Sequence, residues 1–175
     1  MSDTQPKANR WLVVMRHAKS AWPDVADTRR PLAKRGQRDA PEAGAWLREH
    51  GRAPDRVLCS PARRARQTWE LAATGLPTSP PVTHDPRIYE AGVTELLRVI
   101  SECPDRVGTL LLVGHEPAMR ELTLYLAGRG SDRDALERVR AKFPTSGIAV
   151  LAVPVGWAAL TARVARLAAF AVPRG

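Results

Sequence analysis

The chain has 175 residues, of which 44% are apolar and 26% charged, a composition typical of one soluble globular domain. No stretch approaches the roughly 18 uninterrupted apolar residues that a membrane-spanning helix needs, which excludes a helical membrane protein. The 27 basic residues exceed the 18 acidic ones, and the resulting net charge of +9 favours anionic partners such as phosphorylated small molecules, phosphoproteins or nucleic acid.

The first ten residues, MSDTQPKANR, are polar and have neither the apolar core nor the small-residue cleavage site of a secretory signal. We expect residues 1–10 to be a disordered or extended N-terminus and residues 11–175 to form a single domain. We also expect a cytoplasmic protein with no membrane partner. Cys59 and Cys103 lack the spacing of metal ligands, so we expect both to be reduced residues of the core.

The apolar patterning alternates between strand and helix along the chain. In chain order, it predicts a strand at residues 11–15, a helix at 33–50, a strand at 56–59, helices at 62–74 and 93–103, a strand at 109–113, a helix between Pro117 and Gly128, and a strand at 148–153. The strands are apolar at consecutive positions, which indicates a sheet covered on both faces. The sequence therefore predicts an α/β fold, a three-layer sandwich with a mostly parallel central sheet and helices on both faces.

Three segments lack a clear pattern. Residues 75–92 are rich in proline and predict a long ordered loop, and residues 127–135, AGRGSDRDA, predict a more mobile loop. The C-terminal segment 157–170 has apolar spacing that fits a helix and an alanine and valine content that fits an edge strand, so both types stay open.

Basic side chains and histidines follow three of the predicted strands. Arg16 and His17 come directly after the first strand, Arg63 and Arg64 follow the second within SPARRARQT, and His115 follows the third within GHEP. Because ligands bind at the carboxyl ends of parallel strands, we expect these side chains to converge. Phosphoryl transfer needs an in-line nucleophile and fixed positive charge, which an imidazole and arginine forks supply. The sequence therefore predicts an oxyanion site that contains a nucleophile.

Three segments, in this order, resemble motifs of the histidine phosphatase superfamily. VVMRHAKS is similar to its RHG-type opening, CSPARRARQT to its Ser-Pro-x-x-Arg-Ala-x-x-Thr element, and LLLVGHEP to its second-histidine strand. Ala18 stands where the family more often has glycine. The short chain, Ala18 and the segments RRPLAKRGQRDA and IYEAGVTELL are most similar to the SixA-type phosphohistidine phosphatase branch. The resemblance extends from Trp11 to Phe170.

The resemblance implies a phosphoglycerate mutase-like fold and a phosphatase that needs no metal and no other cofactor. It implies that His17 is the nucleophile and becomes phosphohistidine during turnover. Arg16, Arg64 and His115 would form the phosphate pocket, with His115 protonated in the active form. Arg64 holds the family position because it directly precedes the alanine of the motif, so Arg63 is expected to be a solvated or rim residue.

The proton donor for the leaving group is the open part of this site. Superfamily branches that cleave phosphate esters use a carboxylic acid, and Glu90 in YEAG is the best positional candidate. Asp24, Asp27 and Glu116 are the alternatives. A phosphoramidate such as phosphohistidine has a better leaving group than an ester, so its hydrolysis depends less on a dedicated acid.

The leading functional hypothesis is a phosphatase acting on a phosphorylated protein histidine or on a small-molecule phosphate. One alternative is a broad phosphomonoesterase or mutase-like enzyme, against which the short chain argues. Another is a catalytically silent basic module that binds phosphate or RNA on the same scaffold. Nucleic acid is disfavoured because no aromatic residues alternate with the basic ones in a stripe. The sequence gives no indication of the oligomeric state.

Overall fold

The computed structural model describes residues 9–175, so most of the expected N-terminal extension, residues 1–10, lies outside the described residues. Its last residue, Arg10, already belongs to the first strand. Within residues 9–175 the chain forms six strands, β1 (Arg10–Arg16), β2 (Arg56–Cys59), β3 (Val82–His84), β4 (Thr109–Gly114), β5 (Ile148–Val153) and β6 (Arg166–Ala171). This part of the chain, residues 9–175, also forms five α-helices, α1 (Lys34–Glu49), α2 (Arg63–Ala73), α3 (Val93–Ser101), α4 (Ala118–Leu126) and α5 (Arg133–Ala141). Three short 3-10 helices complete the list, η1 (Asp27–Arg29), η2 (Pro86–Ile88) and η3 (Trp157–Ala159).

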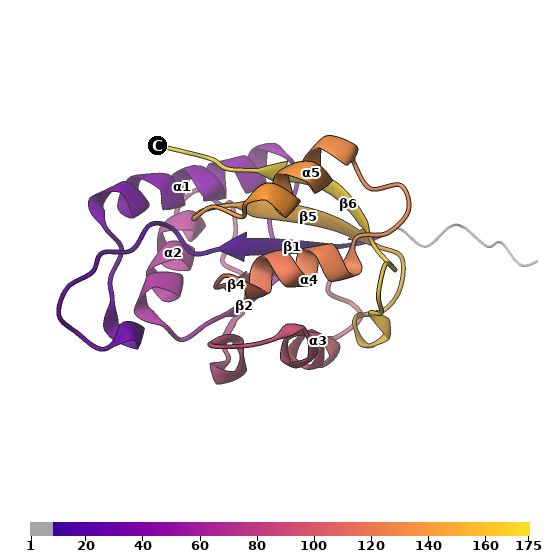
Figure 1. The fold of residues 1–175 in the computed structure, drawn as a ribbon, viewed down its shortest axis with the longest axis horizontal. Coiled ribbons are helices and arrows are strands. Elements are labelled where there is room, and N and C mark those ends of the chain that lie inside the picture. Colours follow the sequence, from indigo (N-terminus) through magenta and orange to yellow (C-terminus); the bar gives the residue numbers. More distant parts are fainter. Residues whose placement is uncertain (1–8) are drawn as a thin grey trace, which may run out of the picture.

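The described strands join one sheet in the order β3-β2-β4-β1-β5-β6 (Figure 1). β1 pairs in parallel with β4, and β2 pairs in parallel with β3 and β4. β5 runs antiparallel to β1 and to β6. The predicted α/β fold with a mostly parallel sheet is confirmed.

Residues of each central strand alternate between two cores, which explains why the strands are apolar at every position. Leu12 and Val14 of β1 face a core shared with α3, α4 and α5. Val13 and Met15 face a second core shared with α1 and α2. Each fully buried aliphatic side chain contributes ~1.5–3 kcal/mol. Burial on both faces therefore stabilises the central strands and confirms the predicted helices on both sides of the sheet.

Two elements lie where the sequence predicts loops. β3 pairs with β2 and has only three residues, which are too few to produce a recognisable apolar period in the sequence. α5 begins at Arg133, so the prediction of a loop is wrong for residues 133–135. The side chain of Asp132 caps this helix by accepting a hydrogen bond from the Ala135 amide at 2.8 Å. Ala135 and Val139 anchor it in the core.

The C-terminal segment contains both a short helical turn and a strand. η3 holds the fully buried Trp157, whose indole donates a hydrogen bond to the Val107 carbonyl at 3.0 Å. β6 follows and forms the edge of the sheet beside β5, as the strand alternative predicts. Cys59 and Cys103 are both free and buried, as expected. No helix within residues 9–175 is both long and apolar enough to cross a membrane.

The register of the sheet brings three loop starts to one edge. Arg16 at the end of β1 lies beside Gly114 at the end of β4, and the His17 amide donates a hydrogen bond to the Gly114 carbonyl at 3.0 Å. The Ser60 amide, directly after β2, donates to the Val113 carbonyl of β4 at 3.0 Å. The carboxyl ends of β1, β2 and β4 therefore meet at the same place.

Candidate active site

His17 follows β1 and is 6% exposed. Its Nδ1 lies 2.7 Å from the carbonyl oxygen of Ala18. A carbonyl oxygen only accepts hydrogen bonds, so the proton of the neutral ring is on Nδ1 and Nε2 keeps its lone pair. Burial is the main cause that lowers the pKa of His17 to about 3, and the ionisable groups of His115, Arg64 and Arg16 lower it further. At neutral pH His17 is therefore an uncharged imidazole with one basic nitrogen.

His115 follows β4 and faces the nucleophile candidate, with 5.2 Å between the centroids of the two rings. Its Nε2 lies 2.7 Å from Oγ of Ser60, which also accepts a hydrogen bond from the Ala62 amide at 3.2 Å. Burial, followed by the charge of Arg64, lowers the pKa of His115 to about 4. The second histidine is therefore also uncharged at neutral pH.

Arg16 ends β1, and its side chain is held by the loop that precedes β5. Its Nη1 donates a hydrogen bond to the Phe143 carbonyl at 3.0 Å. The same loop contacts the nucleophile, because the Ser146 amide donates to the His17 carbonyl at 3.1 Å. Ser146 has a φ of 62°, in the left-handed region that non-glycine residues rarely adopt. Residues 143–147 thus position both members of the Arg-His pair.

Arg64 is the second residue of α2 and is 5% exposed. Its Nη1 donates to the Asp27 carbonyl at 2.8 Å, and its Nη2 donates to Oδ2 of Asp27 at 3.1 Å. Arg63, one residue earlier, is exposed and does not line the same cavity. The structure therefore places Arg64 rather than Arg63 beside the two histidines, in the arrangement that the family motif implies.

The side chains converge on a cavity of about 230 Å³. Its lining residues are Arg16, His17, Lys19, Ser20, Trp22, Arg30, Arg64, His115, Glu116 and Thr145. Within residues 9–175, Nε of Arg16, Nε of Arg64 and Nδ1 of His115 are buried and have no hydrogen-bond partner. Buried polar groups in native proteins are nearly always paired, so unpaired nitrogens on three residues around one cavity indicate a site for a polar ligand, and the two arginine Nε groups need acceptors from it.

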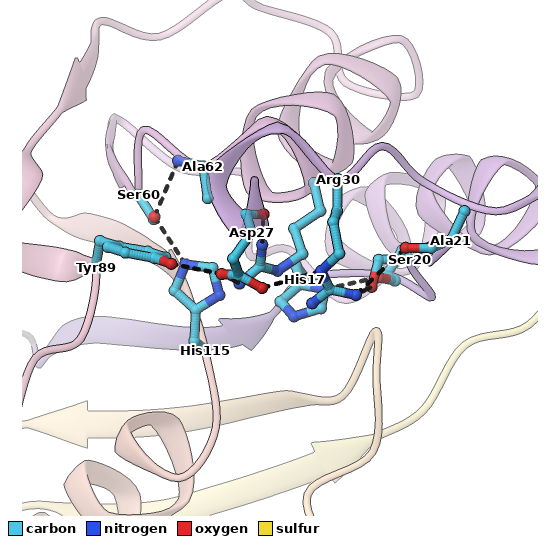
Figure 2. A network of polar contacts seen from close by, with 11 residues as sticks. His17, Ser20, Ala21, Asp27, Arg30, Ser60, Ala62, Tyr89 and His115 are labelled. Carbon is cyan, nitrogen blue, oxygen red and sulfur yellow. Dashed lines mark hydrogen bonds and ion pairs between the residues drawn. The ribbon is translucent and has the colours of Figure 1, made fainter. Parts of the chain in front are cut away.

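Asp27, in η1, connects the loop that follows His17 to the rest of the site through hydrogen bonds (Figure 2). Its carboxylate accepts hydrogen bonds from Arg64, from Arg30 and from the hydroxyl of Tyr89. The bond from Tyr89 is the largest cause that lowers the pKa of Asp27 to about 2. Arg30 also donates to Ser20 Oγ at 3.0 Å. The carboxylate is therefore ionised and partly neutralises Arg64 and Arg30.

Sequence reasoning did not identify Tyr89 or Ser60 as site residues, although both lie inside the segments that carry the resemblance. Tyr89 precedes Glu90 in YEAG and contacts the edge of the His115 ring, with centroids 5.5 Å apart. Ser60 opens SPARRARQT, where a serine before proline is equally well explained as a helix-start residue. No regular spacing in the sequence marks either residue, because each contacts a residue from a distant segment of the chain. Tyr89 contacts Asp27, and Ser60 contacts His115.

The four acid candidates occupy different positions. Glu90 is exposed, has a φ of 59° and does not line the cavity, and Asp24 is likewise exposed and outside the lining. Asp27 is engaged by Arg64 and Arg30. Glu116 lines the cavity, and its Oε1 accepts a hydrogen bond from the Arg120 amide at 2.9 Å. Burial raises the pKa of Glu116. The structure therefore brings Glu116, and not Glu90, to the two histidines.

Comparisons with known proteins identify the family and the fold. The family model for the histidine phosphatase superfamily (branch 1) matches residues 12–108. An uncharacterized protein of Mycobacterium tuberculosis strain H37Rv is 50% identical over 162 residues, covering 91% of this chain and all of the relative.

Three solved structures extend the comparison. A chain from Nakamurella multipartitia, provisionally named phosphohistidine phosphatase SixA, is 35% identical with a TM-score of 0.86, covering 97% of this chain and 99% of the other. The protein histidine phosphatase SixA complexed with tungstate is 26% identical with a TM-score of 0.66, covering 82% of this chain and 88% of the other. A Plasmodium falciparum phosphoglycerate mutase, 15% identical with a TM-score of 0.59 and covering 97% and 94%, shares the fold. With its phosphoglycerate mutase-like fold and its similarity to the SixA branch, this chain is a phosphatase that belongs to the histidine phosphatase superfamily.

Proposed function

We propose that this phosphatase hydrolyses phosphohistidine on a protein, through a covalent phosphohistidine at His17 and without a metal ion. One observation carries the proposal: a neutral imidazole with a basic Nε2 shares a cavity with two arginines whose Nε groups lack acceptors. A phosphoryl group offers the oxygens that these donors lack.

In the first step, Nε2 of His17 attacks phosphorus in line with the P–N bond of the substrate. The lone pair of Nε2 forms the new N–P bond, and the electron pair of the broken bond stays on the leaving imidazole, which takes up a proton from solvent water. The Ala18 carbonyl holds the Nδ1 proton and stabilises the positive charge that develops on the His17 ring. Arg16 and Arg64 stabilise the phosphoryl oxygens.

In the second step, water attacks the phosphorus of the phosphorylated enzyme. The N–P bond breaks, its electron pair returns to Nε2 of His17, and inorganic phosphate leaves with the oxygen of the water. The same arginines hold the phosphoryl oxygens in both steps, because the charge lies on the same atoms.

Phosphate binding changes the charge of the second histidine. The pKa of His115 is lowered to about 4, because burial and Arg64 disfavour the imidazolium. A phosphate dianion beside the ring opposes both effects and raises this pKa. Substrate binding therefore favours the protonated His115 that the family resemblance implies for the active form.

Two properties of the relatives support the choice of substrate. The Nakamurella chain and the tungstate complex are both named SixA, a phosphohistidine phosphatase in one case and a protein histidine phosphatase in the other. Tungstate is a tetrahedral oxyanion like phosphate, so its presence in that relative supports an oxyanion site of the kind proposed for Arg16, Arg64 and His115.

The test compares the wild type with His17→Ala on a phosphohistidine peptide and on p-nitrophenyl phosphate, both with EDTA present. We expect turnover by the wild type with EDTA and no turnover by the variant. Acid-labile phosphate should appear on the wild-type protein after rapid quenching. Full activity of His17→Ala would contradict the assignment of the nucleophile, and loss of wild-type activity in EDTA would contradict the absence of a metal.

Glu116 favours a second candidate function, hydrolysis of phosphate esters. A carboxyl group with a raised pKa in the cavity is suited to protonating an alkoxide leaving group. We expect Glu116→Gln to lower turnover of an alkyl phosphate about 10- to 100-fold while changing turnover of phosphohistidine less than about threefold. Glu90→Gln, in an exposed residue, is the matched control. An equal loss on both substrates would show that Glu116 acts by holding the site together and not as an acid.

A further inference from the structure

A second cleft lies beside the active-site cavity and has no role in the steps above. It has a volume of about 420 Å³ and is lined by Thr28, Arg29, Pro61, Arg63, Arg66, Gln67 and Glu70. These residues come from η1, from the turn after β2 and from the first two turns of α2. We call it the α2 cleft.

The α2 cleft has an excess of positive charge that the protein itself does not neutralise. Arg29, Arg63 and Arg66 are all exposed, and none of them forms an ion pair with a carboxylate of residues 9–175. Glu70 is the one acidic residue in the lining. Arginines without an internal partner remain available for carboxylates of another molecule.

The α2 cleft adjoins the reaction centre through the chain itself. Arg63 directly precedes Arg64, whose guanidinium lines the active-site cavity. Thr28 and Arg29 directly follow Asp27, which accepts hydrogen bonds from Arg64. The α2 cleft and the cavity are thus lined by directly adjacent residues of α2, and a polypeptide with its phosphorylated side chain in the cavity would use this adjacency to place flanking residues in the α2 cleft.

The cleft also continues away from the active site. A further depression of about 480 Å³, lined by Gln37, Gln67, Glu70 and Leu71, shares two of its residues with the α2 cleft. The side-chain oxygen of Gln67 accepts a hydrogen bond from the Leu32 amide at 2.8 Å, which fixes the shared wall. Together the two depressions, of about 420 Å³ and 480 Å³, offer more space than a small phosphate ester would fill.

We propose that the α2 cleft binds an acidic segment flanking the phosphohistidine of the substrate protein, through Arg29, Arg63 and Arg66. This inference rests on the proposed function. A polypeptide is favoured over a nucleic acid because none of the lining residues is aromatic, whereas single-stranded nucleic acids are usually bound by stacking on aromatic rings together with basic side chains. The net charge of +9 adds a long-range attraction for an acidic partner.

The test uses two phosphohistidine peptides of equal length, one with aspartate and glutamate around the histidine and one with asparagine and glutamine at the same positions. Arg63→Ala/Arg66→Ala removes two charges from the α2 cleft. The matched control, Arg133→Ala/Arg140→Ala, removes two exposed charges from α5, on the other face of the sheet. p-Nitrophenyl phosphate, which has no flanking residues, reports on the reaction centre alone.

We expect the wild type to have a kcat/KM about 3- to 10-fold higher on the acidic peptide, mainly through KM, because each exposed ion pair contributes little and three arginines act together. The cleft variant should lose this preference and keep its turnover of p-nitrophenyl phosphate, and the α5 control should keep both. Equal loss in the control would mean that only the overall charge matters and would overturn the proposal. Turnover of both peptides at equal rates by the wild type would also overturn it, whereas no turnover of either peptide would contradict the proposed function instead.

Discussion

His17 and Arg64 are connected by two successive hydrogen bonds as well as by the sheet. The Ala18 amide donates to Oγ1 of Thr68 at 2.9 Å, and the Thr68 hydroxyl donates to the Arg64 carbonyl at 2.7 Å. Both Ala18 and Thr68 are fully buried, so solvent does not compete for these bonds. The distance between His17 and Arg64 is therefore set by α2 and by Ala18. Ala18 is the first residue of the segment 18–33, which we call the nucleophile loop because it follows the proposed nucleophile.

Arg64→Ala removes a guanidinium that contributes positive charge to the cavity. We expect kcat/KM for p-nitrophenyl phosphate to fall about 10²- to 10³-fold, the scale seen when one charge-stabilising donor is lost. Arg63→Ala, one residue away and exposed, should stay within about twofold of the wild type on the same substrate. A larger loss for Arg63→Ala than for Arg64→Ala would mean that Arg63 holds the phosphate.

The protonation states of the two histidines can be measured directly. The pKa of His17 is lowered to about 3 and that of His115 to about 4, so in the phosphate-free protein we expect the imidazole NMR signals of both to report neutral rings at pH 5. The unfolded chain titrates near the ordinary value of 6.5 and binds more protons below it. The free energy of unfolding should therefore fall as the pH drops from about 6.5 towards 3. A midpoint of His17 near 6.5 would contradict its burial as the dominant cause.

At the scale of the element, the long helices and central strands were predictable because their signals are local and repeated. α1, α2 and α3 lie within the predicted ranges, and β5 matches its range residue for residue. α5 follows a polar, glycine-containing loop, so its capping aspartate is read as part of that loop. β6 depends on pairing with β5, and pairing partners distant in sequence leave no local pattern.

The first turn of α1 packs closely against the loop that follows His17. Gly36 lies against the backbone of Lys19, in the nucleophile loop, and a Cβ at this position would overlap the Lys19 carbonyl. This contact gives a physical reason for the glycine within RRPLAKRGQRDA, a segment that belongs to the family resemblance.

Gly36→Ala should displace either the helix or the nucleophile loop. We expect the free energy of unfolding to fall by ~1–3 kcal/mol, the usual cost of overpacking, and kcat/KM to fall together with it. Urea unfolding and phosphatase assays of the same preparation measure both. Glu42→Ala, in an exposed residue of the same helix, is the control. Unchanged stability of Gly36→Ala would show that the contact is easily relieved.

At the scale of the whole molecule, Asp27 joins three segments that are far apart in sequence, namely the nucleophile loop, α2 through Arg64 and the loop after η2 through Tyr89. Its carboxylate accepts one hydrogen bond from Arg64 and one from Arg30. This internal anion therefore neutralises part of the positive charge that a bound phosphate would otherwise meet.

Asp27→Asn keeps the shape of this contact and removes its charge. We expect inorganic phosphate to inhibit the variant at about 3- to 10-fold lower concentration, because Arg64 and Arg30 lose a competing anion worth ~1 kcal/mol at a half-exposed position. Product-inhibition constants at fixed pH measure this, with Asp24→Asn, another exposed acid of the same loop, as the control. Weaker inhibition in Asp27→Asn would mean that the carboxylate mainly orients Arg64.

Local patterns in the sequence were enough to predict the alternating strands and helices, the family, and the placement of Arg16, His17, Arg64 and His115 in segments at or after strand ends. These features follow from local apolar periodicity and from short motifs, which are readable without knowing what lies next to them. In contrast, no local pattern shows that Glu116 rather than Glu90 lines the cavity, because both glutamates lie in loops and the packing of those loops against the sheet edge determines which one lies beside the histidines. The same holds for Asp27, since its contacts arise from packing between segments and are not encoded in any local pattern.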